Sequence, residues 1–91
     1  YGYNDTVIFT PKTTCKVIIN YYNDGEDGSL SQTPYITKEI DAMKSVKYSI
    51  EISNASIDVK YPRVTVTVQY GMGIFSAPYT VIRTALCQCR C

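Results

Sequence analysis

The sequence predicts an all-β domain, built as a two-layer antiparallel sandwich of immunoglobulin-like type with six or seven strands and stapled by disulfides. Three observations predict this fold. Apolar and polar residues alternate with a period of two along most of the chain. Turn residues separate the alternating runs, and no long run has the period of a helix. Finally, four cysteines in a chain of 91 residues are typical of small extracellular domains.

The first half of the chain contains three strand candidates. The segment Tyr1–Pro11 carries a short apolar run, which either forms the first strand or pairs with a neighbouring molecule as a strand donor. Residues 12–91 are then the single sandwich domain. Cys15–Tyr22 is apolar on both faces near its middle, which is typical of a central strand. Ile36–Ile40 predicts a shorter strand.

Four further strands are expected in the second half. Residues 47–53 and 57–61 alternate on either side of the turn signal Asn54-Ala55 and predict a hairpin. Residues 63–70 place valines and Tyr70 on one face and threonines on the other, as in a half-buried strand. Thr80–Cys91 is the last predicted strand.

The cysteines Cys15, Cys87, Cys89 and Cys91 are disulfide candidates. Neighbours in the terminal Cys-x-Cys-x-Cys run lie about 6–7 Å apart in an extended strand, so a bridge between them would be strained. Three arrangements stay open: bridges within the chain, at least one bridge to another chain, and a thiolate metal site. The third lacks the C-x₂-C pairs from which zinc sites are usually built.

Composition excludes several function classes. The net charge is +1 and no basic run interleaves with aromatic residues, so no nucleic-acid partner is expected. The chain has no histidine, which excludes Ser/His and Cys/His catalysis, and we expect neither an enzyme nor a cofactor. The uncharged stretch Val64–Ile82 contains Gln69 and Pro78 and alternates in its first half, so we expect no membrane span.

Two kinds of small-ligand or modification site are candidates. Asp24, Glu26 and Asp27 offer oxygen ligands in a glycine-containing loop, which makes them weak calcium candidates because the EF-hand spacing fails there. The triplets that begin at Asn4 and Asn54 are N-glycosylation acceptors. Together with the cysteines they favour an extracellular or cell-surface location.

Tyrosines and apolar loop residues are the candidates for partner contacts, because nine tyrosines occur with no tryptophan. The interaction candidates are Tyr1, Tyr3, Val7, Ile8, Phe9, Tyr22, Tyr35, Met72, Ile74, Phe75 and Tyr79. We expect a structural or adhesive module that self-associates, possible forms being a filament or a surface layer. Its partners would be copies of itself, another surface protein or a glycan. The alternative is a secreted ligand (toxin, growth-factor-like or lectin-like) that acts through its loops Asn23–Ser29 and Gly71–Phe75.

Overall fold

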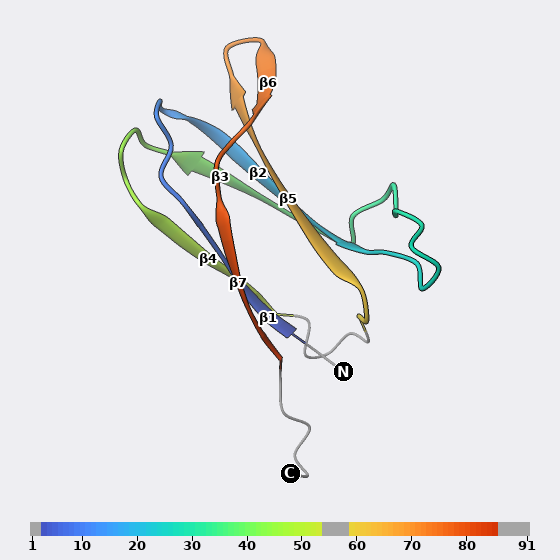
Figure 1. Cartoon of the computed structure of the whole chain (residues 1–91). Coiled ribbons are helices and arrows are strands. Elements are labelled where there is room, and N and C mark those ends of the chain that lie inside the picture. The colour runs from blue at the N-terminus through green and yellow to red at the C-terminus, as the bar shows by residue number, and fades with distance from the viewer. Residues whose placement is uncertain (1–2, 54–58, 86–91) are drawn as a thin grey trace.

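The computed structural model describes residues 3–53 and 59–85, and within these ranges it contains seven strands and no helix. The strands are β1 (Tyr3–Phe9), β2 (Cys15–Asn23), β3 (Ile36–Ala42), β4 (Tyr48–Ser53), β5 (Pro62–Tyr70), β6 (Gly73–Ser76) and β7 (Thr80–Ala85). They form a three-stranded sheet in the order β4-β1-β7 and a four-stranded sheet in the order β3-β2-β5-β6 (Figure 1). The predicted all-β, sandwich-like arrangement of two antiparallel sheets is confirmed.

The core lies between the inner faces of the two sheets. In β1 every second residue is buried, so that Asp5, Val7 and Phe9 point inward. From the other sheet, β2 contributes Val17, Ile19 and Tyr21. The core is completed by Ala42, Ile52, Val59, Val64 and Val66. No helix among the described residues is long and apolar enough to cross a membrane.

The connections place the first and last strands side by side. β1 lies between β4 and β7, and Tyr3 is opposite Ala85 in the antiparallel ladder. The end of β7 therefore lies at one end of the sandwich, together with the start of β1, while the chain enters β2 at the other end (Figure 1). The chain changes sheet between β6 and β7 through Ala77, Pro78 and Tyr79, which we call the β6–β7 linker.

One predicted hairpin is not found among the described residues, and one strand of the structure was not predicted. The hairpin of residues 47–53 with residues 57–61 does not form in the described part, because β4 pairs with β1 and residues 59–61 belong to no strand. Val59 is fully buried as expected, but the backbone N–H of Tyr61 donates to the side chain of Asn23 instead of a ladder. The missed strand is β6, which the sequence presented only as an apolar loop.

The N-terminal segment is the centre of its own sheet. β1 pairs with β4 on one side and with β7 on the other. Val7 and Phe9, both interaction candidates from the sequence, are buried core residues. Removing β1 would thus expose the inner face of the larger sheet and leave β4 and β7 without a common partner strand.

Candidate interaction site

The β5–β6 hairpin extends past the rest of the sandwich (Figure 1). Its end carries exposed apolar side chains. Gly71 and Met72 form its two-residue turn, in which Gly71 has φ +60° as a type II′ turn requires at its first position. Residues 70–75 are here called the hairpin tip. They carry no charge, and Met72 is fully exposed, Ile74 66% exposed and Phe75 54% exposed. Tyr70, expected on the core face, is also exposed because β5 runs beyond the opposite sheet.

The glycine two residues before Phe75 leaves the space that the Phe75 ring occupies. A Cβ atom at Gly73 would lie 2.7 Å from Cζ of Phe75, so the ring occupies the space that any other residue at position 73 would need. Gly73 also pairs with Tyr70 at the start of β6. A larger residue at position 73 would therefore displace the Phe75 ring from the place that it has at the surface.

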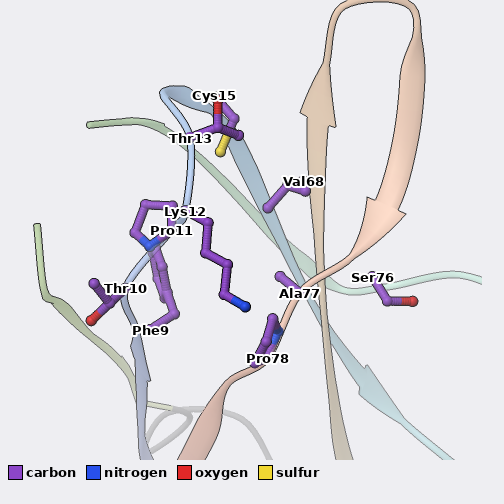
Figure 2. Close-up of a pocket in the computed structure, with 10 residues that line it drawn as sticks. All are labelled: Phe9, Thr10, Pro11, Lys12, Thr13, Cys15, Val68, Ser76, Ala77 and Pro78. Carbon is purple, nitrogen blue, oxygen red and sulfur yellow. The ribbon is translucent and has the colours of Figure 1, made fainter. Parts of the chain in front are cut away.

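An apolar pocket lies at the base of this hairpin. Its wall is formed by the loop after β1, by β5 and by the β6–β7 linker, as Figure 2 shows. The lining residues are Phe9, Thr10, Pro11, Lys12, Thr13, Cys15, Val68, Ser76, Ala77 and Pro78. The cavity volume is about 140 Å³, which is close to the size of engineered cavities that hold benzene. One medium-sized apolar side chain would fill it.

Two chemically distinct side chains border the pocket. Lys12 is exposed, and its side chain extends across the pocket toward the linker (Figure 2). Cys15 is half-buried and its thiol is free. No disulfide forms within the described residues, and the other three candidates, Cys87, Cys89 and Cys91, lie outside them.

A buried ion pair joins the first and last strands. The carboxylate of Asp5, which is 0% exposed, accepts hydrogen bonds from both Nε and Nη2 of Arg83 at 2.8 Å. Burial raises the pKa of Tyr21 above its usual value, and a hydrogen bond to Asp5 adds to the shift. The hydrogen bond to Asp5 likewise raises the pKa of Arg83. This polar cluster lies between the sheets beside the core.

Sequence reasoning missed the ion pair, although a signal for it exists. Asp5 lies an even number of residues from Val7 and Phe9, so it shares their inward face of β1. In the same way, Arg83 shares a face of β7 with Val81. A charge at an inward position of a strand is expensive to bury unless it meets the opposite charge. Two such positions of opposite sign, one in the first strand and one in the last, indicate that these strands are neighbours.

The acidic loop after β2 is organised by its own hydrogen bonds. Arg63 donates from Nε to Asp24 at 2.9 Å, and this bond, together with one from the Ser31 amide, lowers the pKa of Asp24. The pKa of Asp27 is lowered by hydrogen bonds from Ser29. Glu26 is exposed. Among the described residues no group of three or more His, Cys, Asp or Glu side chains could hold a metal ion.

The remaining sequence candidates are scattered over the fold. Asn4 and Ile8 are half-buried on the outer face of β1. The guanidinium of Arg83 lies 5.5 Å from the Tyr3 ring, that of Arg63 lies 4.1 Å from the Tyr22 ring, and Tyr35 packs edge-on against Tyr21. The Tyr79 hydroxyl donates to the carbonyl of Val64. Tyr1 and Asn54 lie outside the described residues.

Of all these candidates, Met72, Ile74 and Phe75 are the ones that the fold places together at one exposed hairpin end, with Ile74 and Phe75 on opposite faces of β6 and a pocket at the base of the hairpin. In comparisons with protein-family models, with curated proteins and with solved structures, no match to this chain was found. Chemically, the hairpin tip and the pocket provide an apolar projection and an apolar hole at the same end of the domain. This end is the candidate interaction site.

Proposed function

We propose that this chain is an extracellular structural or adhesive module that associates with copies of itself, as in a filament or a surface layer. The observation that carries the proposal is the uncharged hairpin tip beside an apolar pocket. Exposed apolar surfaces of this kind mark contact sites in proteins, because water covers them at a cost in free energy. Fully burying a side chain such as that of Met72 or Phe75 contributes about 1.5–3 kcal/mol.

A second copy of the chain fits this surface. Met72 projects freely from the turn, and the pocket at the base of the same hairpin has room for one such side chain. A contact in which Met72 of one copy enters the pocket of the next buries apolar area on both copies and can repeat from copy to copy, as a filament requires. The free thiol of Cys15 borders the same pocket, so a contact there also brings this cysteine close to a neighbour.

Chain length limits which terminal cysteines can form a bridge with Cys15 of the same chain. Cys15 lines the pocket with Phe9, and Ala85 lies opposite Tyr3, a full β1 length of about 20 Å away. Cys87 and Cys89 follow Ala85 by two and four residues, which span at most about 7 Å and 14 Å. Neither reaches Cys15 of the same chain while β7 stays in its sheet. Cys91 follows Ala85 by six residues, which span at most about 21 Å, so it is the one terminal cysteine within reach of Cys15 of its own chain. A bridge from Cys87 or Cys89 to Cys15 would therefore join two copies.

The proposal includes an immunoglobulin-like sandwich in an oxidising compartment. In immunoglobulin domains strand B lies between A and E, and strand C lies between C′ and F. The orders β7-β1-β4 and β3-β2-β5-β6 follow the same arrangement if β1 corresponds to B. In this correspondence β7, the last strand described here, occupies the position that strand A has in an immunoglobulin domain. The outward-facing Asn4 is compatible with an N-linked glycan there.

The test is sedimentation velocity over a range of protein concentrations for the wild type and two variants. Met72→Asp places a charge on the hairpin tip without touching the core. Leu30→Asp is the matched control, since Leu30 is 62% exposed in the loop at the opposite end of the sandwich. We expect concentration-dependent oligomers for the wild type and the control, and their loss in Met72→Asp. Negative-stain electron microscopy with and without reductant then shows whether the oligomers are regular fibres and whether disulfides hold them.

A single monomeric species for all three proteins would overturn the proposal and favour the alternative, a secreted ligand that acts through its loops. The fold constrains that alternative. Residues 23–29 follow β2 at one end of the sandwich and the hairpin tip lies at the other, because Asn23 is opposite Pro62 at the start of β5. The two loops would therefore form two separate binding surfaces. A loss of receptor or glycan binding in Phe75→Ser, with the fold intact, would identify the hairpin tip as the one used.

A further inference from the structure

The edge of β1 that faces away from β4, here called the slot beside β1, has to be filled by a strand. Asp5 and Val7 are both 0% exposed, and β7 covers them on the side of β1 that β4 leaves open. Without β7, the Asp5 carboxylate would lose both hydrogen bonds from Arg83 while still lying between the sheets. The slot is also specific, because only a strand with a cation opposite Asp5 satisfies this carboxylate.

β7 itself is lightly packed. Five of its six residues are exposed and only Val81 is half-buried. Within the described residues it forms a ladder with β1 alone, so it is an edge strand. Its attachment therefore consists mainly of backbone hydrogen bonds to β1 and the Arg83–Asp5 ion pair, and β7 of any copy can form both with β1 of any other copy.

The β6–β7 linker is suited to carry the strand away. It spans only Ala77, Pro78 and Tyr79 between the two sheets, and the pocket lies beneath it. The residue before a proline prefers an extended conformation, so Pro78 favours a straight path over a tight turn at Ala77. In Figure 2 the linker passes over the pocket, with Pro78 facing Lys12 and Phe9.

We propose that β7 is an exchangeable strand: β7 of one copy fills the slot beside β1 of a second copy, with Arg83 of the donor bound to Asp5 of the acceptor. This inference rests on the proposed self-association and specifies a mode for it. The exchanged strand makes the same ladder and the same ion pair as the strand of the chain itself, so the two states differ only in the linker. A chain that gives its strand to one neighbour and accepts from another forms an open polymer.

β7 fits this role better than β1. β1 has partners on both sides and contributes Asp5, Val7 and Phe9 to the interior, so its departure would dismantle the core. The departure of β7 leaves the larger sheet and the β1–β4 pair in place. The donor strand is therefore at the C-terminal side of the domain, not in the N-terminal segment.

The experiment uses cysteine pairs placed on different full-length chains. Thr6 and Ile82 lie directly opposite each other on the outer face of the β1–β7 ladder, a spacing that suits a disulfide. An isotopically heavy Thr6→Cys chain is refolded together with a light Ile82→Cys chain and oxidised, and peptides are mapped by mass spectrometry. Thr84→Cys is the matched control because Thr84 lies opposite Asn4. We expect heavy–light peptides joining positions 6 and 82 at several-fold the yield of the control pair.

A second variant keeps the test independent of crosslinking chemistry. Deletion of Pro78 shortens the linker, which strains the path of β7 back to its own β1 and should raise the yield of the heavy–light peptide. Insertion of four Gly/Ser residues after Ala77 relaxes that path and should lower it. Equal yields in the two linker variants, or equal yields with Ile82→Cys and Thr84→Cys, would overturn strand exchange.

The outcomes separate the two proposals. Oligomers that depend on Met72 but give no peptide joining positions 6 and 82 would refute the exchange of β7 and leave self-association through the hairpin tip in place. Monomers without that peptide would refute both. Oligomers with the peptide, insensitive to Met72→Asp, would support β7 exchange and remove the hairpin tip as the cause of assembly.

Discussion

Replacing Arg83 by methionine should strongly destabilise the domain although Arg83 lies near the surface. The side chain of Arg83 is 37% exposed, whereas that of Asp5 is fully buried. Arg83→Met keeps the aliphatic stem and removes the guanidinium that donates both hydrogen bonds at 2.8 Å. The Asp5 carboxylate is then left between the sheets without its cation.

The size of the effect follows from this asymmetry. Removing one partner of a buried pair costs about 3–5 kcal/mol, a large part of the roughly 5–15 kcal/mol by which a small domain is stable. Asp5→Asn should cost less, about 1–3 kcal/mol, because Arg83 lies near the surface and water can solvate it. The double change Asp5→Leu with Arg83→Met should be less damaging than Arg83→Met alone, since no charge remains buried.

Urea denaturation in the presence of reductant measures these differences. With an m value of about 1.5 kcal/mol per M, a loss of about 4 kcal/mol lowers the midpoint by about 2.7 M. Lys16→Met is the control, because the Lys16–Glu39 pair is exposed at 3.4 Å and such pairs contribute only about 0–1 kcal/mol. A loss in Arg83→Met no larger than that in Lys16→Met would refute the reasoning. So would a double variant less stable than Arg83→Met.

Two further predictions concern the pH dependence of stability. The pKa of Tyr21 is raised in the folded protein, mainly by burial, so stability should be complete below pH 10.0, the ordinary value, and decline as pH rises further. Tyr21→Phe should show a shallower alkaline decline of the urea midpoint, and an unchanged slope would contradict this. The pKa of Asp24 is lowered, chiefly by its hydrogen bond from Arg63, so its contribution should be present above about pH 4 and lost as pH falls below that. Asp24→Asn should reduce the acid dependence, and an acid limb as steep as that of the wild type would contradict the assignment.

Local patterns in the sequence were sufficient for the class of fold. The apolar run in residues 15–22 identified β2, and the alternation in residues 63–70 identified β5 and the face that it buries, because a strand exposes successive side chains to opposite sides. The apolar middle of β2 also indicated a central strand, and β2 does lie between β3 and β5. By contrast, β6 is only four residues long and consists of one glycine, two apolar residues and one serine, so periodicity carried no signal there.

Pairing between strands depends on contacts that the local pattern does not contain. Residues 47–53 were expected to pair with the next run along the chain, but β4 pairs with β1 instead. The candidate site shows the same limit. Met72 and Phe75 were candidates from their composition, yet their exposure depends on how far β5 and β6 extend beyond the opposite sheet.

By itself, then, the sequence determined an all-β domain and the inward and outward faces of its alternating strands. It also identified residues of the hairpin tip as candidates for partner contacts. These properties follow from the two-residue period of a strand and from turn chemistry, which act over a few residues. Only the tertiary structure decided that the last strand lies against the first, that Asp5 meets Arg83, and that an apolar pocket forms beside the hairpin tip. These features join residues nearly a whole chain apart, and such contacts form only when the two sheets pack together.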